Sequence, residues 1–291
     1  MLAAYVLNLL AERDADLPPL LGRANYAQVL AQISLVDAPL AAAVHDKEGL
    51  KPLACSGLLD ANPLERRHSV RKGQRLRVRV SATDPTLSRC LHRCLVEQCP
   101  SHWELDRHAY AVEGVACSAQ DDTWAGISSC QEIARRHMLD GSNLPPTVTL
   151  KFASPLSFKS AKGLNVALPL PSLVFGSLAD RWNSVSSAVF REEMRAFADE
   201  YIGISCYDLR SVPVPQTNGA LRIGCVGTVT YRALDGDRYW LGAMQALAEF
   251  AFYSGVGVQT ATGMGQVCRV GVSGSGAAKG VAARQGGRSS R

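Results

Sequence analysis

The stretch Gly255–Gln266, GVGVQTATGMGQ, carries four glycines in its first eleven residues; it follows a run with helical spacing and precedes the strand-like segment Val267–Val270. Because glycine has no Cβ, this backbone can adopt positive φ angles and approach another polymer closely. Consecutive exposed N–H groups in such a loop form an anion-binding concavity. The loop therefore predicts a phosphate ligand, with a flexible surface turn as the alternative.

The order of elements around this loop excludes two common phosphate-binding folds. A dinucleotide-binding glycine loop follows a strand and opens a helix, whereas this loop follows a helix and opens a strand. A P-loop ends in Gly-Lys-Ser/Thr, and this stretch contains no lysine. The fold must therefore be read from the rest of the chain.

Hydrophobic spacing outward from the loop predicts two consecutive β-α-β-β-α-β units. Apolar residues recur at every second position in a half-buried strand and at every third or fourth position on one face of a helix. The first unit is expected at Leu2–Leu10, Asn25–Val36, Pro52–Leu59, Arg75–Val80, Asp84–Val96 and His102–Val115, with a short extra helix at Pro39–His45. The second is expected at Thr147–Phe152, Ser172–Ala198, Ile202–Leu209, Ile223–Ala233, Tyr239–Tyr253 and Gln266–Val270.

The repeated order predicts an α+β protein of two tandem ferredoxin-like (RRM-like) domains, a fold frequently used for RNA binding. The N-terminal domain is expected over residues 1–143 and the C-terminal domain over 144–271, with the boundary at Gly141–Asn143 before two prolines. Residues 272–291 are rich in Gly, Ala, Ser and Arg. Such a segment lacks the apolar content to pack, so we expect a disordered tail.

Composition permits a polyanionic partner and argues against a membrane protein. The 291 residues are 47% hydrophobic, and 31 Lys and Arg exceed 26 Asp and Glu to give a net charge of +5. Nine cysteines without the dense spacing of a secreted scaffold indicate reduced thiols and a cytoplasmic protein. Met1–Leu10 has no basic leader and is expected to form a core strand, and no apolar run is long enough to span a bilayer.

Three stretches of the second half carry a family resemblance when taken in order: Leu150–Phe158, Pro171–Asn183 and the glycine loop. Together they resemble the CRISPR-associated endoribonuclease that cuts precursor CRISPR RNA within its repeats, the sixth Cas protein of the repeat-associated (RAMP) superfamily. The resemblance covers Thr147–Val270 well and the first half more loosely.

This resemblance implies two ferredoxin-like domains and a metal-independent cleavage without a cofactor. The 2′-OH of the RNA attacks the adjacent phosphate and leaves a 2′,3′-cyclic phosphate and a 5′-OH end. The implied partner is CRISPR repeat RNA in precursor form. Subunits of a CRISPR effector complex and a second copy of this chain are further candidate partners.

His45 is the candidate proton carrier among six histidines, because imidazole titrates near neutral pH. It lies at the end of the first helical region, and Lys51 follows six residues later. On spacing alone, His45 could equally be a solvated residue at a helix C-terminus. In the family that the chain resembles, the active histidine lies at this helix end with a lysine assisting, which implies catalytic roles for His45 and Lys51.

A third catalytic residue is left open. Some family members carry a tyrosine or arginine on the preceding helix; Arg23, Tyr26 and Gln32 are close to that region, but none matches the position. Lys47 is a second candidate cation beside His45.

Candidate RNA contacts lie in both halves. Arg75, Arg77 and Arg79 alternate along a predicted strand and so share one face, which favours contact with the RNA backbone over a plain solvated face. In the glycine loop the candidates are Gly255, Gly257, Thr260, Gly263 and Gly265. Lys159 follows a predicted strand and is explained equally well by turn chemistry, and Arg181, on a predicted helix, could face either the interior or RNA.

No metal site is predicted. Cys90, Cys94, Cys99 and His102 have partial zinc-ligand spacing, but no second pair of ligands follows. Buried thiols are the preferred interpretation. The remaining histidines are expected to be ordinary surface or partly buried residues, with His68 in a basic loop.

Two rival functions remain open. The same double fold could retain guide RNA as a non-catalytic subunit of an effector complex. A nucleotide-using enzyme could also employ the glycine loop as its phosphate site, although the order of helix, loop and strand argues against it.

Overall fold

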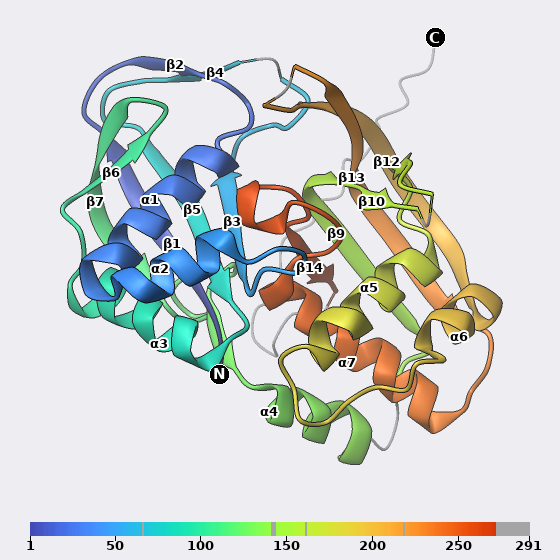
Figure 1. Ribbon diagram of the computed structural model, residues 1–291. Coiled ribbons are helices and arrows are strands. Elements are labelled where there is room, and N and C mark those ends of the chain that lie inside the picture. Colours follow the sequence, from blue (N-terminus) through green and yellow to red (C-terminus); the bar gives the residue numbers. More distant parts are fainter. Residues whose placement is uncertain (66, 141–143, 161, 218, 272–291) are drawn as a thin grey trace, which may run out of the picture.

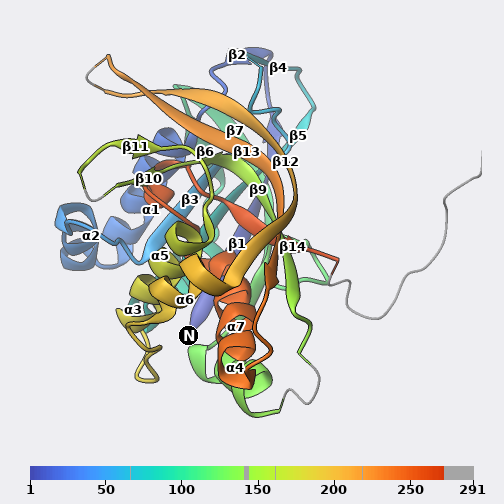
Figure 2. The same ribbon diagram turned by 90° about the vertical axis from the view of Figure 1, so that its right-hand side faces the viewer.

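The computed structural model describes residues 1–65, 67–140, 144–160, 162–217 and 219–271. The two halves of the chain lie side by side, and each packs its main helices on one side of an antiparallel sheet (Figure 1). Figure 2, turned by 90°, shows helices α1, α2 and α5 on the same side of the long strands β12 and β13. The predicted boundary at residues 141–143 and the predicted tail at 272–291 lie outside the described residues.

The first sheet has the strand order β3-β5-β1-β7-β6, and β8 pairs with the start of β1. Its strands are β1 (Leu2–Ala11), β3 (Leu53–Leu58), β5 (Arg75–Ala82), β6 (His102–Leu105), β7 (His108–Ala116) and β8 (Gly126–Ser128). Its helices are α1 (Gly22–Val36), α2 (Ala38–Asp46) and α3 (Pro85–His92), which a π-helical turn, η1 (Arg93–Glu97), prolongs. A separate ribbon pairs β2 (Ala15–Leu17) with β4 (His68–Val70).

The second sheet has the order β12-β13-β9-β14. Its strands are β9 (Thr147–Leu156), β12 (Ile202–Pro215), β13 (Leu221–Ala233) and β14 (Val267–Val270), and β10 (Phe158–Lys159) pairs with β11 (Asn165–Val166) beside it. The helices are α4 (Cys130–Ala134), its π-helical continuation η2 (Arg135–Leu139), α5 (Pro171–Asn183), α6 (Met194–Tyr201), α7 (Arg238–Ser254) and the short 3-10 turn η3 (Thr260–Thr262).

Both sheets place the four strands of a β-α-β-β-α-β unit in the order second, third, first, fourth. This is the ferredoxin-like arrangement, and the predicted fold of two such units is confirmed. Two details differ from the predicted elements. The segment Ser172–Ala198 forms two helices, and His102–Val115 forms two strands.

The second difference has a local cause. Asp106 and Arg107 join β6 to β7 with φ angles of 50° and 66°. Two successive residues in the left-handed region form a type I′ hairpin turn. Neither residue is glycine, so the Asn-Gly or Asp-Gly signature that marks such a turn is missing from the sequence.

Aspartates cap two helices of the first half, α2 and α3, at their N-termini. The Asp84 carboxylate accepts a hydrogen bond from the amide of Leu87 at 2.8 Å, and the Asp37 carboxylate accepts one from the amide of Leu40 at 2.9 Å. Each aspartate satisfies a free N–H of the first turn, and each helix has proline in that turn. Asp37 thereby starts α2, the helix that carries His45.

A buried polar network joins the two halves. Arg79 donates from Nη1 to Oε1 of Gln266 at 2.8 Å, and Gln266 donates from Nε2 to the carbonyl of Cys55 at 3.2 Å. Ser81 donates to the carbonyl of Tyr253 at 2.8 Å. Because buried polar groups must find partners, this network sets how the halves meet and hence the shape of the space between them.

Candidate functional site

Lys51 stabilises the C-terminal end of α2, the helix that carries His45, by two hydrogen bonds. Its Nζ donates to the carbonyl of Val44 at 2.7 Å and to the carbonyl of His45 at 2.6 Å. The last carbonyls of a helix lack intrahelical partners, and an ammonium group there also interacts favourably with the helix dipole. Lys51 therefore fixes the last turn of α2 and holds a positive charge next to His45.

The surroundings of Lys51 make its amine easier to deprotonate. Partial burial lowers the pKa of Lys51, and the charge of Lys47 lowers it further, while the charge of Asp46 opposes the shift. The positive charge is thus held in a partly dry site, where it acts more strongly on a developing negative charge than it would in water.

The His45 side chain is exposed, and within the described residues its imidazole has no hydrogen-bond partner. His45 and Lys51 were predicted together, and the structure places them at one helix end. Their catalytic roles stay predictions. An exposed imidazole at this position is accessible to a polymeric ligand from the solvent side.

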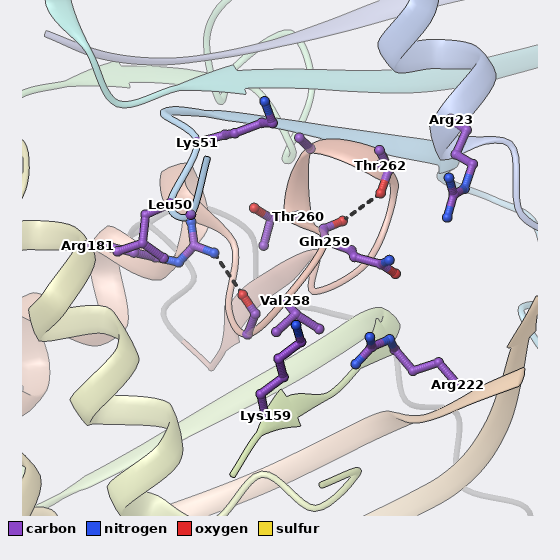
Figure 3. Close-up of a pocket in the computed structure, with 13 residues that line it drawn as sticks. Arg23, Leu50, Lys51, Lys159, Arg181, Arg222, Val258, Gln259, Thr260 and Thr262 are labelled. Carbon is purple, nitrogen blue, oxygen red and sulfur yellow. Dashed lines mark hydrogen bonds between the residues drawn. The ribbon is translucent and has the colours of Figure 1, made fainter. Parts of the chain in front are cut away.

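Beside this helix end lies a pocket of about 530 Å³ between the two halves. The pocket is lined by five cationic residues: Arg23, Lys51, Lys159, Arg181 and Arg222. No carboxylate is among its lining residues. Figure 3 shows the cationic side chains around the Gly257–Thr262 segment, with Lys159 and Arg222 on one side of it and Arg23 on another. This charge distribution suits a polyanion.

The glycine loop forms one wall of the pocket with only part of its length. Gly257 and Thr260 line the pocket. Gly257 has φ of +77°, and a Cβ there would lie 2.4 Å from the carbonyl oxygen of Ser157. The loop backbone is thus pressed against Ser157, the residue between β9 and β10, and glycine is required for that contact.

The other glycines of the loop serve contacts inside the protein. A Cβ on Gly265 would lie 1.9 Å from the carbonyl oxygen of Val256, and the Gly265 amide donates to the carbonyl of Pro155 at 2.9 Å. The expectation that this amide reaches an RNA phosphate is therefore wrong. Gly263 packs against Gly22 of α1, and Gly255 donates to Ala251 at the end of α7 at 2.9 Å.

The arginines of β5 do not form one open face. Arg79 is 0% exposed. The second half covers it, because its guanidinium donates to Gln266 and to the carbonyl of Phe252, and the carbonyl of Trp124 in the first half accepts a further hydrogen bond. The expectation that Arg79 contacts RNA is wrong, because alternation along a strand cannot show which part of a sheet face another domain covers.

Arg75 and Arg77 remain at the surface with carboxylate partners. Arg75 pairs with Glu113 at 2.8 Å, and Arg77 pairs with Asp60 and with Asp122. These hydrogen bonds and charges raise the pKa of both guanidinium groups. Their contact with RNA stays a prediction, and any such contact competes with the ion pairs.

Of the three residues considered for the open catalytic role, Arg23 lines the cationic pocket. The hydroxyl of Tyr26 is buried without a hydrogen-bond partner among the described residues, and burial, followed by the charges of Cys55 and Asp46, raises its pKa. Arg222 was missed by the sequence analysis, and nothing in its local sequence marks it. It reaches the pocket because β13 begins there.

The partial zinc-ligand pattern does not form a metal site in the described residues, where no group of three or more His, Cys, Asp and Glu side chains is suitably placed. Cys90 and Cys94 are buried thiols, as predicted, and Cys99 is exposed. None of the described helices combines the length and the apolar character needed to cross a membrane.

This chain is similar to known proteins in both sequence and structure. The family model of the CRISPR-associated endoribonuclease Cas6 matches residues 150–267. A solved Cas6 product complex is 26% identical, with a TM-score of 0.76, and the match covers 93% of this chain and 99% of that one. A second Cas6 product complex is 26% identical with a TM-score of 0.73, covering 92% and 98%. No curated protein matches the sequence.

Two further structures show how far the likeness extends. Cas6 of Thermus thermophilus is 24% identical with a TM-score of 0.71, and the match covers 93% of this chain and 98% of that one. A Cas6-related protein from Pyrococcus furiosus is 11% identical with a TM-score of 0.60, covering 94% and 100%. Both share the fold over nearly their whole length.

Proposed function

We propose that this chain is a CRISPR-associated endoribonuclease of the Cas6 family and that it cleaves precursor CRISPR RNA within its repeats by attack of a ribose 2′-OH on the adjacent phosphate. The observation that carries the proposal is the position of His45 and Lys51 at one helix end, beside a pocket lined by five cations and no carboxylate. Product complexes of two solved relatives also support it.

The proposed reaction is an internal transesterification. The 2′-oxygen loses its proton and bonds to phosphorus, and the bond from phosphorus to the 5′-oxygen breaks. That oxygen takes a proton and leaves as a 5′-OH, while the phosphate remains as a 2′,3′-cyclic diester. No water is consumed in this step. The protein has to move protons, stabilise charge and hold the RNA in line.

His45 is proposed to transfer a proton as general acid or base. Its imidazole is exposed at the end of α2, and histidine is the side chain best suited to proton transfer near neutral pH. A solved Cas6 relative that carries a histidine-to-alanine substitution has the same fold, at 25% identity. Arg23 and Tyr26 on α1 are the candidates for the second proton-transfer partner.

Lys51 is proposed to stabilise the extra negative charge of the pentavalent phosphorane. Its ammonium group is held by two carbonyls of the His45 turn, so the charge is already in place before the RNA binds. Preorganised charge in a partly dry site lowers the barrier because little reorganisation is needed during the reaction. We therefore propose that cleavage requires no metal ion and no cofactor.

The RNA backbone is proposed to run along the cationic pocket, over Gly257 and Thr260 and between Arg23, Lys159 and Arg222. Subunits of an effector complex and a second copy of this chain are further proposed partners. A cytoplasmic location is proposed as well, in keeping with nine free cysteines.

The test is cleavage of repeat RNA in the presence of a chelator, with both product ends mapped. We expect a 2′,3′-cyclic phosphate and a 5′-OH, and we expect no cut when the nucleotide before the cut is 2′-deoxy. Products with a 5′-phosphate, or cutting that needs added magnesium, would contradict the proposed chemistry. Tight binding without any cut would favour the non-catalytic RNA-binding subunit instead.

A further inference from the structure

Arg181 is a buried cation without a counter-ion. It lies on α5 and is 6% exposed. Its Nη2 donates to the carbonyl of Gly257 at 2.7 Å and its Nη1 to the carbonyl of Ser254 at 3.5 Å. The Nε atom is buried without a partner, and no salt bridge involves Arg181 in the described part of the chain.

This arrangement is unfavourable in the free protein. A guanidinium group that leaves water for the interior loses solvation, and a carboxylate partner normally compensates for part of that loss. Burial lowers the pKa of Arg181 to about 10, so the group remains charged at neutral pH. Arg79 is even more buried, but each of its three guanidinium nitrogens donates to a carbonyl, hydroxyl or amide oxygen at the domain interface.

The uncompensated charge lies under the cationic pocket. Arg181 lines the pocket, and Figure 3 shows its guanidinium directed toward the Gly257 carbonyl on the pocket wall. A second lining residue, Arg222, also has a buried Nε without a partner in the described residues. Lys51 lines the pocket, whereas His45 does not. The pocket therefore adjoins the reacting groups at Lys51 and extends past them toward Lys159, Arg181 and Arg222, where it is suited to bind an anion other than the reacting phosphate.

We propose that Arg181 is a positioning residue that seats one phosphodiester of the RNA in this pocket, at a nucleotide other than the one that is cut. The inference rests on the proposed function, because the phosphodiester is that of the substrate RNA. Lys159 and Arg222, at the wall, would contact the phosphate oxygens. Arg181 would act from the buried side of the pocket wall, through its charge and through the hydrogen bond to Gly257 that holds the Gly257–Thr262 segment in place.

A scan with neutral methylphosphonate linkages tests this role. Each oligonucleotide carries the repeat, a 2′-deoxy block at the cut, and one methylphosphonate that removes a single backbone charge. For the parent protein we expect one position away from the cut at which neutralisation weakens binding about 10-fold, the effect of losing a charge-assisted contact. In Arg181→Met, neutralising that position should cause no further loss of affinity. The slope of log K against log[salt] should fall in magnitude by about 0.7.

Arg269→Met is the matched control. Arg269 is also partly buried and hydrogen-bonded to a carbonyl and an amide oxygen, both of Gln245, and its Nε also lacks a partner among the described residues. It does not line the pocket. Its variant should reproduce the parent scan. Arg181→Lys, which keeps the charge, should retain a reduced loss at the same position and serves if the methionine variant does not fold.

The outcomes separate this inference from the proposed function. Normal cutting of unmodified repeat RNA combined with a parent-like scan in Arg181→Met and Arg181→Lys would overturn the role of Arg181 alone. A scan that changes in Arg181→Met, in a protein that never cuts, would overturn the enzyme and leave the phosphate site. A protein that does not bind repeat RNA would overturn both.

Discussion

Gly22 and Gly263 meet backbone to backbone: a Cβ on Gly22 would lie 2.2 Å from the Cα of Gly263. The first residue of α1 thus touches the residue that follows η3, and each lies in a different half of the molecule. No side chain larger than hydrogen fits between them. The glycine loop is consequently a joint between the two sheets as well as a wall of the cationic pocket.

Gly263→Val should therefore destabilise the fold rather than act on RNA contact alone. Its φ of +105° is unfavourable for valine, and the added side chain would meet the backbone of Gly22 at 2.7 Å from the Cβ position. We expect the free energy of unfolding in urea to fall by about 3 kcal/mol. Gly114→Ala, where a Cβ meets nothing within 4 Å, is the control. An unchanged unfolding midpoint in Gly263→Val would show that the halves can separate there at no cost.

His45→Ala should slow cleavage by about 10²–10⁴-fold, the usual contribution of general acid–base catalysis. Affinity for 2′-deoxy-blocked repeat RNA should change by no more than a few-fold, because the imidazole makes no hydrogen bond within the described structure. Single-turnover rates measure the first effect, and His102→Ala, another exposed histidine, is the control. A variant that cuts at the parent rate would require a different proton carrier.

Lys51→Met should lower the cleavage rate more than it lowers affinity. The substitution removes both the charge and the two hydrogen bonds that hold the Val44 and His45 carbonyls, so the last turn of α2 should also fray. Lys47→Met removes an exposed charge from the same helix end and should have a much smaller effect. If the loss of rate and the loss of affinity are equal, Lys51 only positions RNA.

Cations of the pocket should contribute more to RNA binding than the paired arginines of β5. Lys159→Ala is expected to weaken binding several-fold and to reduce the salt slope, because a phosphate contact releases counter-ions. Arg75→Ala removes an arginine already paired with Glu113, and its effect should be smaller. Titrations at two salt concentrations compare the variants. A larger loss in Arg75→Ala would move the RNA path onto the first sheet.

Because of the contact between η2 and α7, the free energy of unfolding should decrease as the pH becomes acidic. Burial disfavours the Glu249 carboxylate, but the hydrogen bond from His137 at 2.6 Å and the charge and hydrogen bond of Arg136 outweigh it and lower the pKa of Glu249. A lowered pKa in the folded state adds stability above the unfolded-state pKa and loses it as the pH falls through the folded-state value.

Glu249→Gln should accordingly be less stable than the parent near neutral pH by about 1–2 kcal/mol. The difference should shrink as the pH falls below the ordinary carboxyl pKa. Urea melts at several pH values measure it, with Glu48→Gln, an exposed glutamate, as the control. A difference that does not vary with pH would mean that the carboxylate charge is not involved.

The fold could be predicted from local sequence, because hydrophobic periodicity is a property of neighbouring residues. The spacing in Asn25–Val36 and the alternation in Arg75–Val80 predict α1 and β5 without knowledge of the rest of the chain. The pair His45 and Lys51 was also within reach, because the two residues are six positions apart on one helix end.

The pocket could not be predicted from local sequence. Lys159, Arg181 and Arg222 come from three separate elements, and only the packing of α5, β10 and β13 around the glycine loop brings them together. The same limit explains Arg79. Its place on one face with Arg75 and Arg77 follows from alternation, but the cover over that face depends on residues more than 170 positions away.

The joint at Arg79 has a practical consequence for kinetics. Its hydrogen-bond acceptors are carbonyl, hydroxyl and amide oxygens, none of which gains or loses a proton in water near neutrality. Burial lowers the pKa of Arg79 only to about 10. The contacts of Arg79 therefore do not change protonation near neutral pH, the range in which histidine titrates. A pH–rate profile recorded across that range is therefore not distorted by any loosening of the contacts of Arg79.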